Sequence, residues 1–217
     1  KSRKALERWM GKRGHGTVGL DYCCGIGQLS LDLAKDGAQV HGIDISDEEI
    51  GTAKEAAAAA ELSDRVHFAV MDAENLDFED QKFDFIICSG VLHHLDLDLA
   101  YPELSRVLKP DGSILCIEAV GHNPIFNLYR RRTPHLRTPW EIDHILKIGD
   151  VRHAGKYFSR IDIHFYHLFA LLAVPLRNTP LFYPALSFLD AIDAVVLRVP
   201  LLRLMAWQMI FELSGPK

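Results

Sequence analysis

Apolar and polar positions follow two different periods along the first 119 residues. Helical spacing and strong helix formers predict helices at 3–10, at 29–35, at 97–108 and from Asp47 along an alanine-rich stretch. Short apolar runs between them predict strands, at 17–22, 39–43, 66–70, 83–88 and 113–119. Strands that alternate with helices indicate a parallel sheet with right-handed crossovers, rather than an all-β or all-α domain.

The pattern changes after residue 119. Helices are expected at 123–132 and 140–158, and strands at 160–166 and 206–213. Between these two strands, residues 168–205 form an apolar insertion with four prolines, which we expect to act as a lid or an interface. No repeat or linker marks a boundary, so we predict one α/β domain over 1–217. Its sheet would be doubly wound, seven-stranded and mostly parallel, with an antiparallel last strand and a helical apolar insertion between strands six and seven.

Composition narrows the class of protein and its surroundings. A chain of 217 residues with 48% hydrophobic and 24% charged residues is typical of one folded domain. Its formal net charge of -5 offers no general attraction to nucleic acid, which is not expected as a partner. The chain shows neither a secretory signal nor an apolar run of the roughly 20 residues that cross a bilayer, so we expect a cytoplasmic location. The cysteines lack zinc-ligand or disulfide-framework spacing and predict buried thiols and no metal site: Cys23, Cys24, Cys88 and Cys116.

A glycine-rich turn follows the first strand. It runs from Asp21 to Gln28 and contains Gly25 and Gly27 just before a predicted helix. Such a turn brings backbone N–H groups and a helix N-terminus close to a ligand, with no side chain between them. The same glycines would also be needed merely to tighten a strand-to-helix turn, so this segment alone leaves both interpretations open.

Acidic residues follow the next two strands at the same expected edge of the sheet. Asp44 ends the second strand, where a carboxylate can accept both hydrogen bonds of a ribose diol. Asp72, after the third strand, could accept from an adenine amino group. Each has a plainer alternative: Asp44 as a helix-capping acid beside Ser46 and Asp47, and Asp72 as a solvated loop acid.

Five segments in order resemble the motifs of the class I S-adenosylmethionine-dependent methyltransferases. The usual first motif, Asp-x-Gly-Cys-Gly-x-Gly, is similar to residues 21–27, although Cys23 stands where glycine is commoner. The other four are similar to residues 42–46, 71–74, 83–95 and 108–113. The resemblance runs through most of the chain and is strongest to the ubiquinone/menaquinone methyltransferase-like group of small-molecule methyltransferases. It implies a Rossmann-like fold, with S-adenosylmethionine as cofactor and S-adenosylhomocysteine as product.

The resemblance also assigns cofactor-binding residues. Those around the methionine moiety would be Asp21, Gly25 and Gly27. Asp44 and Ile45 would contact the ribose, Asp72 and Ala73 the adenine, and Ser89 and Val91 would close the site. Residues 1–16 are a shorter lead-in than many relatives have, so we expect a substrate-covering N-terminal helix to be shortened or missing. A nicotinamide-dependent dehydrogenase fits less well, because Ser30 stands where the dinucleotide fingerprint has its third glycine or alanine.

Histidines are the candidates for proton transfer. Methyl transfer is an in-line displacement that needs donor and acceptor held in alignment. A hydroxyl or amine acceptor also loses a proton, which a histidine near neutral pKa can accept. His93 and His94 follow the fourth strand, and we favour His94 as the base. His122, with Asn123, follows the fifth strand, and Glu118 could orient both. The alternative is that these residues only shape their loops.

The second half carries candidates for acceptor binding. The cluster that could bind a carboxylate or phosphate, or form a solvated helix face, comprises Tyr129, Arg130, Arg131, Arg132, His135 and Arg137, with His153 and Tyr157 as weaker candidates. The apolar insertion at 168–205 favours an apolar or lipid-like acceptor, unless it contacts a membrane surface or a second copy of the chain, or simply packs on the sheet. We therefore predict methyl transfer to a hydroxyl, amine or carbon of a small acceptor. The alternatives are a protein methyltransferase and a non-catalytic S-adenosylmethionine-binding protein.

Overall fold

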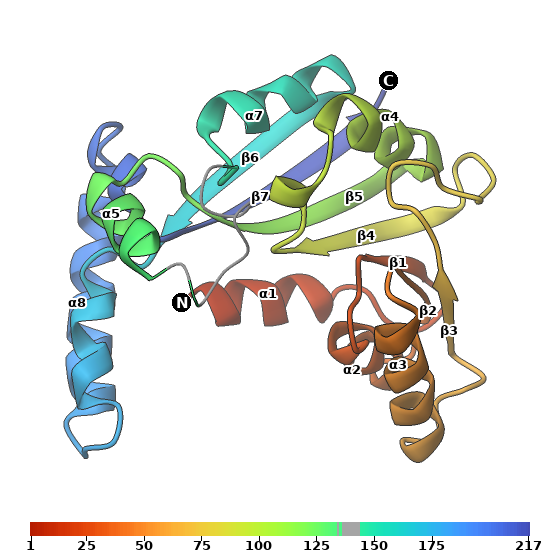
Figure 1. Ribbon diagram of the computed structural model, residues 1–217, viewed down its shortest axis with the longest axis horizontal. Helices are drawn as coiled ribbons and strands as arrows, with labels where there is room; N and C mark the ends of the chain where they lie inside the picture. The colour runs from red at the N-terminus through yellow and green to blue at the C-terminus, as the bar shows by residue number, and fades with distance from the viewer. Residues whose placement is uncertain (134, 136–143) are drawn as a thin grey trace.

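The computed structural model describes residues 1–133, 135 and 144–217, and its strands form a seven-stranded sheet (Figure 1). The strand order is β3-β2-β1-β4-β5-β7-β6. Neighbouring strands are parallel except β7, which runs antiparallel to both β5 and β6. The predicted doubly wound sheet with an antiparallel last strand is thus confirmed. The strands are β1 Val18–Tyr22, β2 Gln39–Asp44, β3 Val66–Val70, β4 Phe83–Ser89, β5 Leu108–Ala119, β6 Phe158–Tyr166 and β7 Gln208–Pro216.

Helices begin where side chains accept hydrogen bonds from exposed backbone N–H groups. Ser46 accepts from Glu49 N at the start of α3, and Asn123 accepts from Ile125 N at the start of α5. The α-helices are α1 Ser2–Met10, α2 Gln28–Lys35, α3 Asp47–Ala59, α4 Leu97–Val107, α5 Pro124–Arg132, α7 Ile148–His153 and α8 Phe182–Val196. Short 3-10 helices are η1 Leu92–His94, η3 Ala154–Lys156, η4 Ala170–Leu176 and η5 Leu202–Met205.

Two predicted elements differ from the structure. The helix expected at 140–158 is shorter in the structure: residues 144–147 are irregular, α7 begins only at Ile148, η3 ends at Lys156, and β6 already starts at Phe158. Lys147 N donates to the Asp150 carboxylate at 2.7 Å, which starts the helix there. Residues 140–143 lie outside the described residues. The strand expected at 113–119 begins earlier, at Leu108, and residues 109–112 form a bulge between two pairs of the β4–β5 register.

The sheet has an apolar core on each face, because side chains alternate along its strands. In β4, Phe85 and Ile87 belong to one core and Ile86 and Cys88 to the other. The first core is covered by α1, α2 and α3, and the second by α4 and α7 (Figure 1). Both faces of the central strands are therefore dry, which leaves the sheet's edges and loops for a functional site.

The insertion between β6 and β7 is helical, as predicted. It contains η4, α8 and η5, and it is tied to the end of β6 through buried Asp193. The Asp193 carboxylate accepts the backbone N–H groups of Leu168, Phe169 and Ala170 at 3.1, 2.8 and 3.1 Å. Among the described residues, no helix has the length and apolarity that spanning a membrane demands. Figure 1 shows α5 and α8 at the edge of the sheet toward which β4 and β6 point.

Candidate functional site

The candidate site lies where the sheet's connections change direction. The chain runs from β1 outward through β2 to β3, and then returns to form β4 on the other side of β1. Ligands of doubly wound sheets bind at such a switch point, outside the carboxyl ends of the strands. All predicted cofactor-binding residues lie there, at or after the ends of four parallel strands: Asp21, Gly25, Gly27, Asp44, Ile45, Asp72, Ala73, Ser89 and Val91.

The turn after β1 passes through the left-handed region three times. Cys23, Gly25 and Gly27 have φ angles of 58°, 51° and 77°. A Cβ on Gly27 would come within 2.5 Å of the Phe68 ring, so no other residue fits without displacing that ring. The conformation of Cys23 is one that glycine adopts without cost, which accounts for the glycine commoner at this place. Cysteine keeps the same backbone path here, at the cost of local strain.

Asp44 connects the ends of β1 and β2. Its Oδ2 accepts from Gly25 N at 2.9 Å, and its Oδ1 accepts from Ser46 N at 3.0 Å. The two backbone donors fix the plane of the carboxylate, and each oxygen retains acceptor capacity for a second hydrogen bond. The cap of α3 is Ser46 rather than Asp44. Ile45, next in the chain, is 77% exposed, which offers an apolar surface beside the carboxylate.

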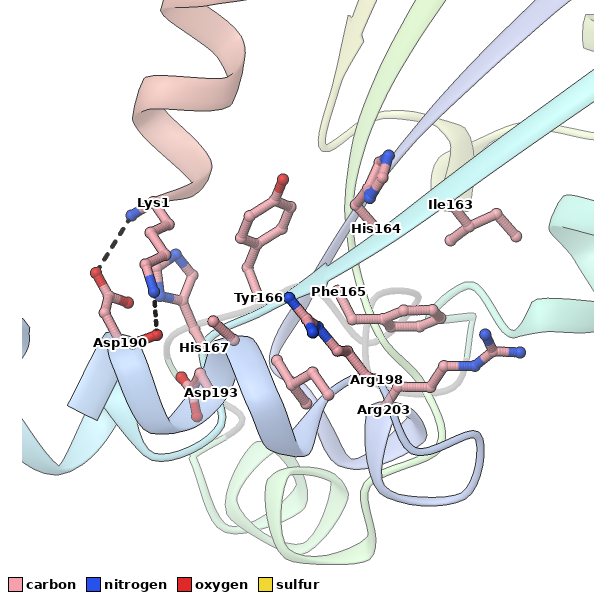
Figure 2. A pocket seen from close by; sticks show the side chains of 12 residues that line it. Lys1, Ile163, His164, Phe165, Tyr166, His167, Asp190, Asp193, Arg198 and Arg203 are labelled. Atoms are coloured by element: carbon pink, nitrogen blue, oxygen red, sulfur yellow. Dashed lines mark hydrogen bonds and ion pairs between the residues drawn. The ribbon is translucent and has the colours of Figure 1, made fainter. Parts of the chain in front are cut away.

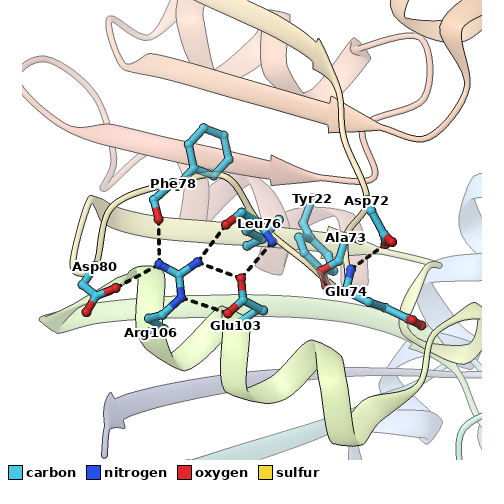
Figure 3. A network of polar contacts seen from close by, with 9 residues as sticks. All are labelled: Tyr22, Asp72, Ala73, Glu74, Leu76, Phe78, Asp80, Glu103 and Arg106. Atoms are coloured by element: carbon cyan, nitrogen blue, oxygen red, sulfur yellow. Dashed lines mark hydrogen bonds and ion pairs between the residues drawn. The ribbon is translucent and has the colours of Figure 1, made fainter.

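The loop after β3 is held from behind by an arginine that the sequence analysis missed (Figure 3). The Arg106 guanidinium donates to the carbonyl oxygens of Leu76 and Phe78, at 2.9 and 2.6 Å, and to the Glu103 carboxylate at 2.7 and 2.9 Å. This contact also holds the pKa of Glu103 below its usual value. No local motif marks the pair, because α4 is distant in sequence from the loop it binds.

The front of the same loop carries Asp72 and Ala73. Asp72 Oδ1 accepts from Glu74 N at 2.9 Å, which turns this exposed carboxylate back over its own loop. The Ala73 carbonyl accepts from the Tyr22 hydroxyl at 2.6 Å, so the loop is also tied to the end of β1. Loop and central strand are therefore positioned together.

Asp21 gives the site an unusual electrostatic character. Its side chain is buried, and the Ser30 hydroxyl donates to Oδ2 at 2.6 Å. Loss of solvation raises the pKa of Asp21 to about 6; the Ser30 hydrogen bonds lower it, and the charge of Asp44 raises it further. Two carboxylates close to the same glycine turn favour a ligand that carries positive charge.

Glu118, at the end of β5, organises the loop after β4. Its side chain is fully buried; Oε1 accepts from Val91 N and Leu92 N at 2.9 and 2.8 Å, and Oε2 lies 2.8 Å from His93 Nδ1. His94 is exposed, and its ring centroid lies 4.1 Å from that of His93. Glu118 therefore orients His93. The sequence had led us to expect that it would orient His122 and Asn123 instead.

Those two residues have other contacts. His122 Nε2 accepts from Ile148 N at 3.1 Å, so this histidine joins the loop after β5 to the start of α7. Asn123 caps α5 and donates to the carbonyl of Met205, at the end of the insertion. Both follow the carboxyl end of β5, and their contacts join it to α7 and to the insertion.

The predicted basic cluster does not share one environment. Arg130 is buried, with its Cζ 5.1 Å from the centroid of the Trp207 ring and Nη1 donating to Asn127, whereas Arg131 and Arg132 are exposed, as are Tyr129 and His135. Arg137 lies outside the described residues. His153 Nε2 is 2.7 Å from an Asp98 carboxylate oxygen, and both His153 and Tyr157 lie near the Tyr101 ring.

Comparisons with known proteins agree with this architecture. The family model described as "Methyltransferase domain" matches residues 20–116, which include every predicted cofactor-binding residue. Demethylmenaquinone methyltransferase of Staphylococcus aureus is 39% identical over 120 residues, covering 54% of this chain and 48% of the relative. The chain thus spans about half the length of the curated relatives it matches.

Two solved structures illustrate the range of proteins that share the fold. Phosphoethanolamine N-methyltransferase 2 of Haemonchus contortus, crystallised with S-adenosyl-L-methionine, has a TM-score of 0.70 and 20% identity, covering 100% of this chain and 52% of that chain. The [4+2]-cyclase SpnF has a TM-score of 0.67 and 23% identity, covering 98% of this chain and 81% of that chain. At these identities the likeness establishes the architecture alone.

Proposed function

We propose, from the premise that the chain belongs to the class I S-adenosylmethionine-dependent methyltransferases, that it methylates a small apolar or lipid-like acceptor and releases S-adenosylhomocysteine. The acceptor atom would be a hydroxyl oxygen, an amine nitrogen or a carbon. The observation that carries the proposal is the hydrogen bond between Gly25 N and Asp44, which joins the glycine turn to the ribose-side acid within the matched segment.

The residues present fit S-adenosylmethionine. Asp44 has acceptor capacity left for a ribose diol, and Gly25 and Gly27 allow close approach of the backbone. Asp21 favours a cationic methionine moiety, while Asp72 and Ala73 lie where the adenine edge would be bound. Ile45, Ser89 and Val91 would complete the contacts. When bound, the cofactor supplies a methyl group activated by a positively charged sulfur; the protein's part is to align the acceptor with it.

The contact with Glu118 leads us to favour His93 over His94 as the proton acceptor. A carboxylate at Nδ1 holds the proton on that nitrogen, leaves the lone pair on Nε2 and stabilises the imidazolium once it forms. His94 remains the second candidate, because its ring stacks on His93 in the same loop. His122 comes third, since its Nε2 already accepts a backbone hydrogen bond.

The acceptor would enter from the side covered by α5 and the insertion at 168–205. Helix α5 presents Ile125 and Leu128, and the insertion presents Leu181 and Phe188, all at least half exposed. The 39% identical relative is named for demethylmenaquinone, which makes an isoprenoid quinone the first acceptor to test. We further propose that the chain is one domain acting in the cytoplasm, where the free thiols of its four cysteines would persist. Residues 168–205 would form its contact with a membrane or a second copy.

The test begins with calorimetric titration of S-adenosylhomocysteine into the chain, its Asp44→Ala variant and the matched control Asp64→Ala. We expect Asp44→Ala to weaken binding by about 1–3 kcal/mol, as a charged acceptor is lost, while Asp64→Ala binds normally. Incubation with labelled S-adenosylmethionine and a short-chain demethylmenaquinone should then yield a methylated, solvent-extractable product. Cofactor binding without methylation of any acceptor pool would favour a non-catalytic binding protein, and methylation of peptides alone a protein methyltransferase.

A further inference from the structure

The exposed face of α8 lacks charge. Its exposed residues recur at helical spacing and therefore share one face: Tyr183, Pro184, Ser187, Phe188, Ala191, Ala194 and Val195. A surface helix normally carries charged and polar side chains on this side. The two acidic residues of α8 lie elsewhere: Asp193 is buried, and the side chain of Asp190 is only 15% exposed.

The apolar exposure continues on both sides of α8. Leu172 and Leu181, before or at its start, are 66% and 64% exposed, and Leu201, after it, is 77% exposed. We call the exposed apolar side chains of residues 172–202 the docking face. Isolated exposed apolar residues are ordinary on a protein surface, but a run of this length on one insertion indicates a partner.

Positive charge borders the docking face. Arg177 precedes α8 and Arg198 follows it, and both are exposed. With Arg203, the insertion carries three arginines against two aspartates, whereas the whole chain has a net charge of -5. The insertion is therefore locally basic on a chain that is acidic as a whole.

Two of these arginines line a cavity of about 410 Å³ between β6 and the end of α8 (Figure 2). His164 and Phe165 of β6 also line it, and Arg203 Cζ lies 5.5 Å from the centroid of the Phe165 ring. The acidic groups on this cavity are Asp190 and Asp193, of which Asp193 is already bound by three backbone N–H groups. Guanidinium groups beside an apolar wall suit a phosphate attached to an apolar chain.

These features favour a lipid surface over a second copy of the chain or a membrane span. With 15 residues, α8 is about 22 Å long, too short to cross a bilayer of about 30 Å hydrocarbon thickness. If the docking faces of two copies met, the arginines of both insertions would lie close together, and neither insertion has an exposed acidic residue to pair with them. This repulsion disfavours a dimer through the docking face. An anionic bilayer complements the arginines and repels the acidic remainder of the chain, which also sets the orientation.

We propose that residues 172–203 dock the protein on an anionic membrane surface, with the docking face in the interfacial region and Arg198 and Arg203 at lipid phosphates. The purpose of this docking rests on the proposed function. Helices α5 and α8 follow the carboxyl ends of β5 and β6, and the loops proposed to bind the cofactor follow the carboxyl ends of the parallel strands β1 to β4. Asn123, which caps α5, is hydrogen-bonded to the end of the insertion. A lipid-like acceptor could therefore pass from the bilayer to the site without crossing bulk water.

The test is co-sedimentation of the protein with vesicles of phosphatidylglycerol and phosphatidylcholine, and with vesicles of phosphatidylcholine alone. We expect binding to the anionic vesicles that weakens with added salt. Phe188→Asp should weaken it at least about tenfold, whereas the matched control Leu99→Asp, at an exposed position of α4, should leave it unchanged. Arg198→Gln should weaken it about fivefold, and the control Arg152→Gln should not.

Equal binding by Phe188→Asp and the unaltered chain, or no vesicle binding at all, would overturn the inference. Light scattering after size exclusion adds a further refutation: a dimer that Phe188→Asp dissociates would assign the docking face to a second copy. Titration of S-adenosylhomocysteine into the same preparations without vesicles separates the two proposals. Cofactor binding without docking overturns only this inference, and docking without cofactor binding overturns only the proposed function.

Discussion

Replacing Asp21 with asparagine should stabilise the protein while weakening its preference for a cationic cofactor. Burial disfavours the charge of Asp21 and raises its pKa in the folded chain to about 6, from an ordinary value of 3.8. A folded state that holds a proton more tightly than the unfolded state loses stability as pH rises between these two values. At about 1.36 kcal/mol for each pKa unit, the accumulated loss above pH 6 is about 3 kcal/mol.

Asparagine has nearly the same shape as aspartate and no charge. Asp21→Asn should therefore raise the free energy of unfolding at pH 7.5 by about 1–3 kcal/mol, less than the full loss, because the hydrogen bond from Ser30 is weakened. Urea unfolding of both proteins at pH 4, 6 and 7.5 measures it. The unaltered chain should lose stability relative to the variant between pH 4 and 6 and run parallel to it above. Ser30→Ala is the companion variant: without the hydroxyl, the pKa of Asp21 should rise further and extend the loss to higher pH.

The same substitution should act on ligand selectivity. Under the proposed function, an ionised Asp21 would attract the sulfonium of S-adenosylmethionine but not the neutral thioether of S-adenosylhomocysteine. Asp21→Asn should therefore lower the ratio of their affinities, and the affinity of the unaltered chain for S-adenosylmethionine should rise with pH through about 6. If Asp21→Asn is no more stable at pH 7.5, and the pH dependence between 4 and 6 persists in it, the assignment of that dependence to buried charge is wrong.

Four further outcomes are expected. Burial lowers the pKa of His41 to about 4, so this residue lowers the free energy of unfolding as pH falls from 6.5 to 4. In His41→Phe, the urea concentration at the unfolding midpoint should depend less on pH over that interval, and an unchanged pH dependence would contradict this. At the positive φ of Cys23, Cys23→Gly should fold normally while Cys23→Val loses about 1–3 kcal/mol in thermal unfolding; equal stability would refute the strain. Arg106→Leu should weaken cofactor binding about tenfold or more by calorimetry, with Arg65→Leu as control, since the loop after β3 loses its support. Glu118→Gln should reduce kcat for an acceptor that loses a proton by about 10²-fold and alter its pH profile, more than it reduces cofactor affinity; an unchanged profile would remove His93 as the base.

The placement of the candidate cofactor-binding residues at one end of the sheet was largely predictable from sequence, because its determinants are local. The strand, turn and helix at 18–35 are encoded by adjacent residues, and Gly25 and Gly27 announce the positive φ angles that the turn requires. Asp44 follows directly on the short apolar run that predicts the second strand. Parallel strands then bring such strand ends to one edge, so the site follows from the topology once the alternation of strands and helices is recognised.

Features that depend on contacts between distant segments were not predictable in the same way. Arg106 and Glu103 look like ordinary residues of an amphipathic helix, and only the fold brings them behind the loop at 76–80. Glu118 was noticed but given the wrong partner, because strand spacing does not reveal that β5 lies beside the loop after β4. The bulge at 109–112 and the late start of α7 likewise depend on pairing and capping that compete with local propensity.

The three backbone N–H groups that converge on Asp193 have a consequence for how this protein could diversify. They bind the carboxylate from α8 to the chain just after β6, so the start of the insertion and its main helix form one hydrogen-bonded knot. Such a closed unit keeps its attachment to the sheet when residues on its outer surface are exchanged. Transplanting residues 168–205 between relatives, with this aspartate retained, should exchange the proposed acceptor preference and leave residues 20–116, which the methyltransferase family model matches, unchanged.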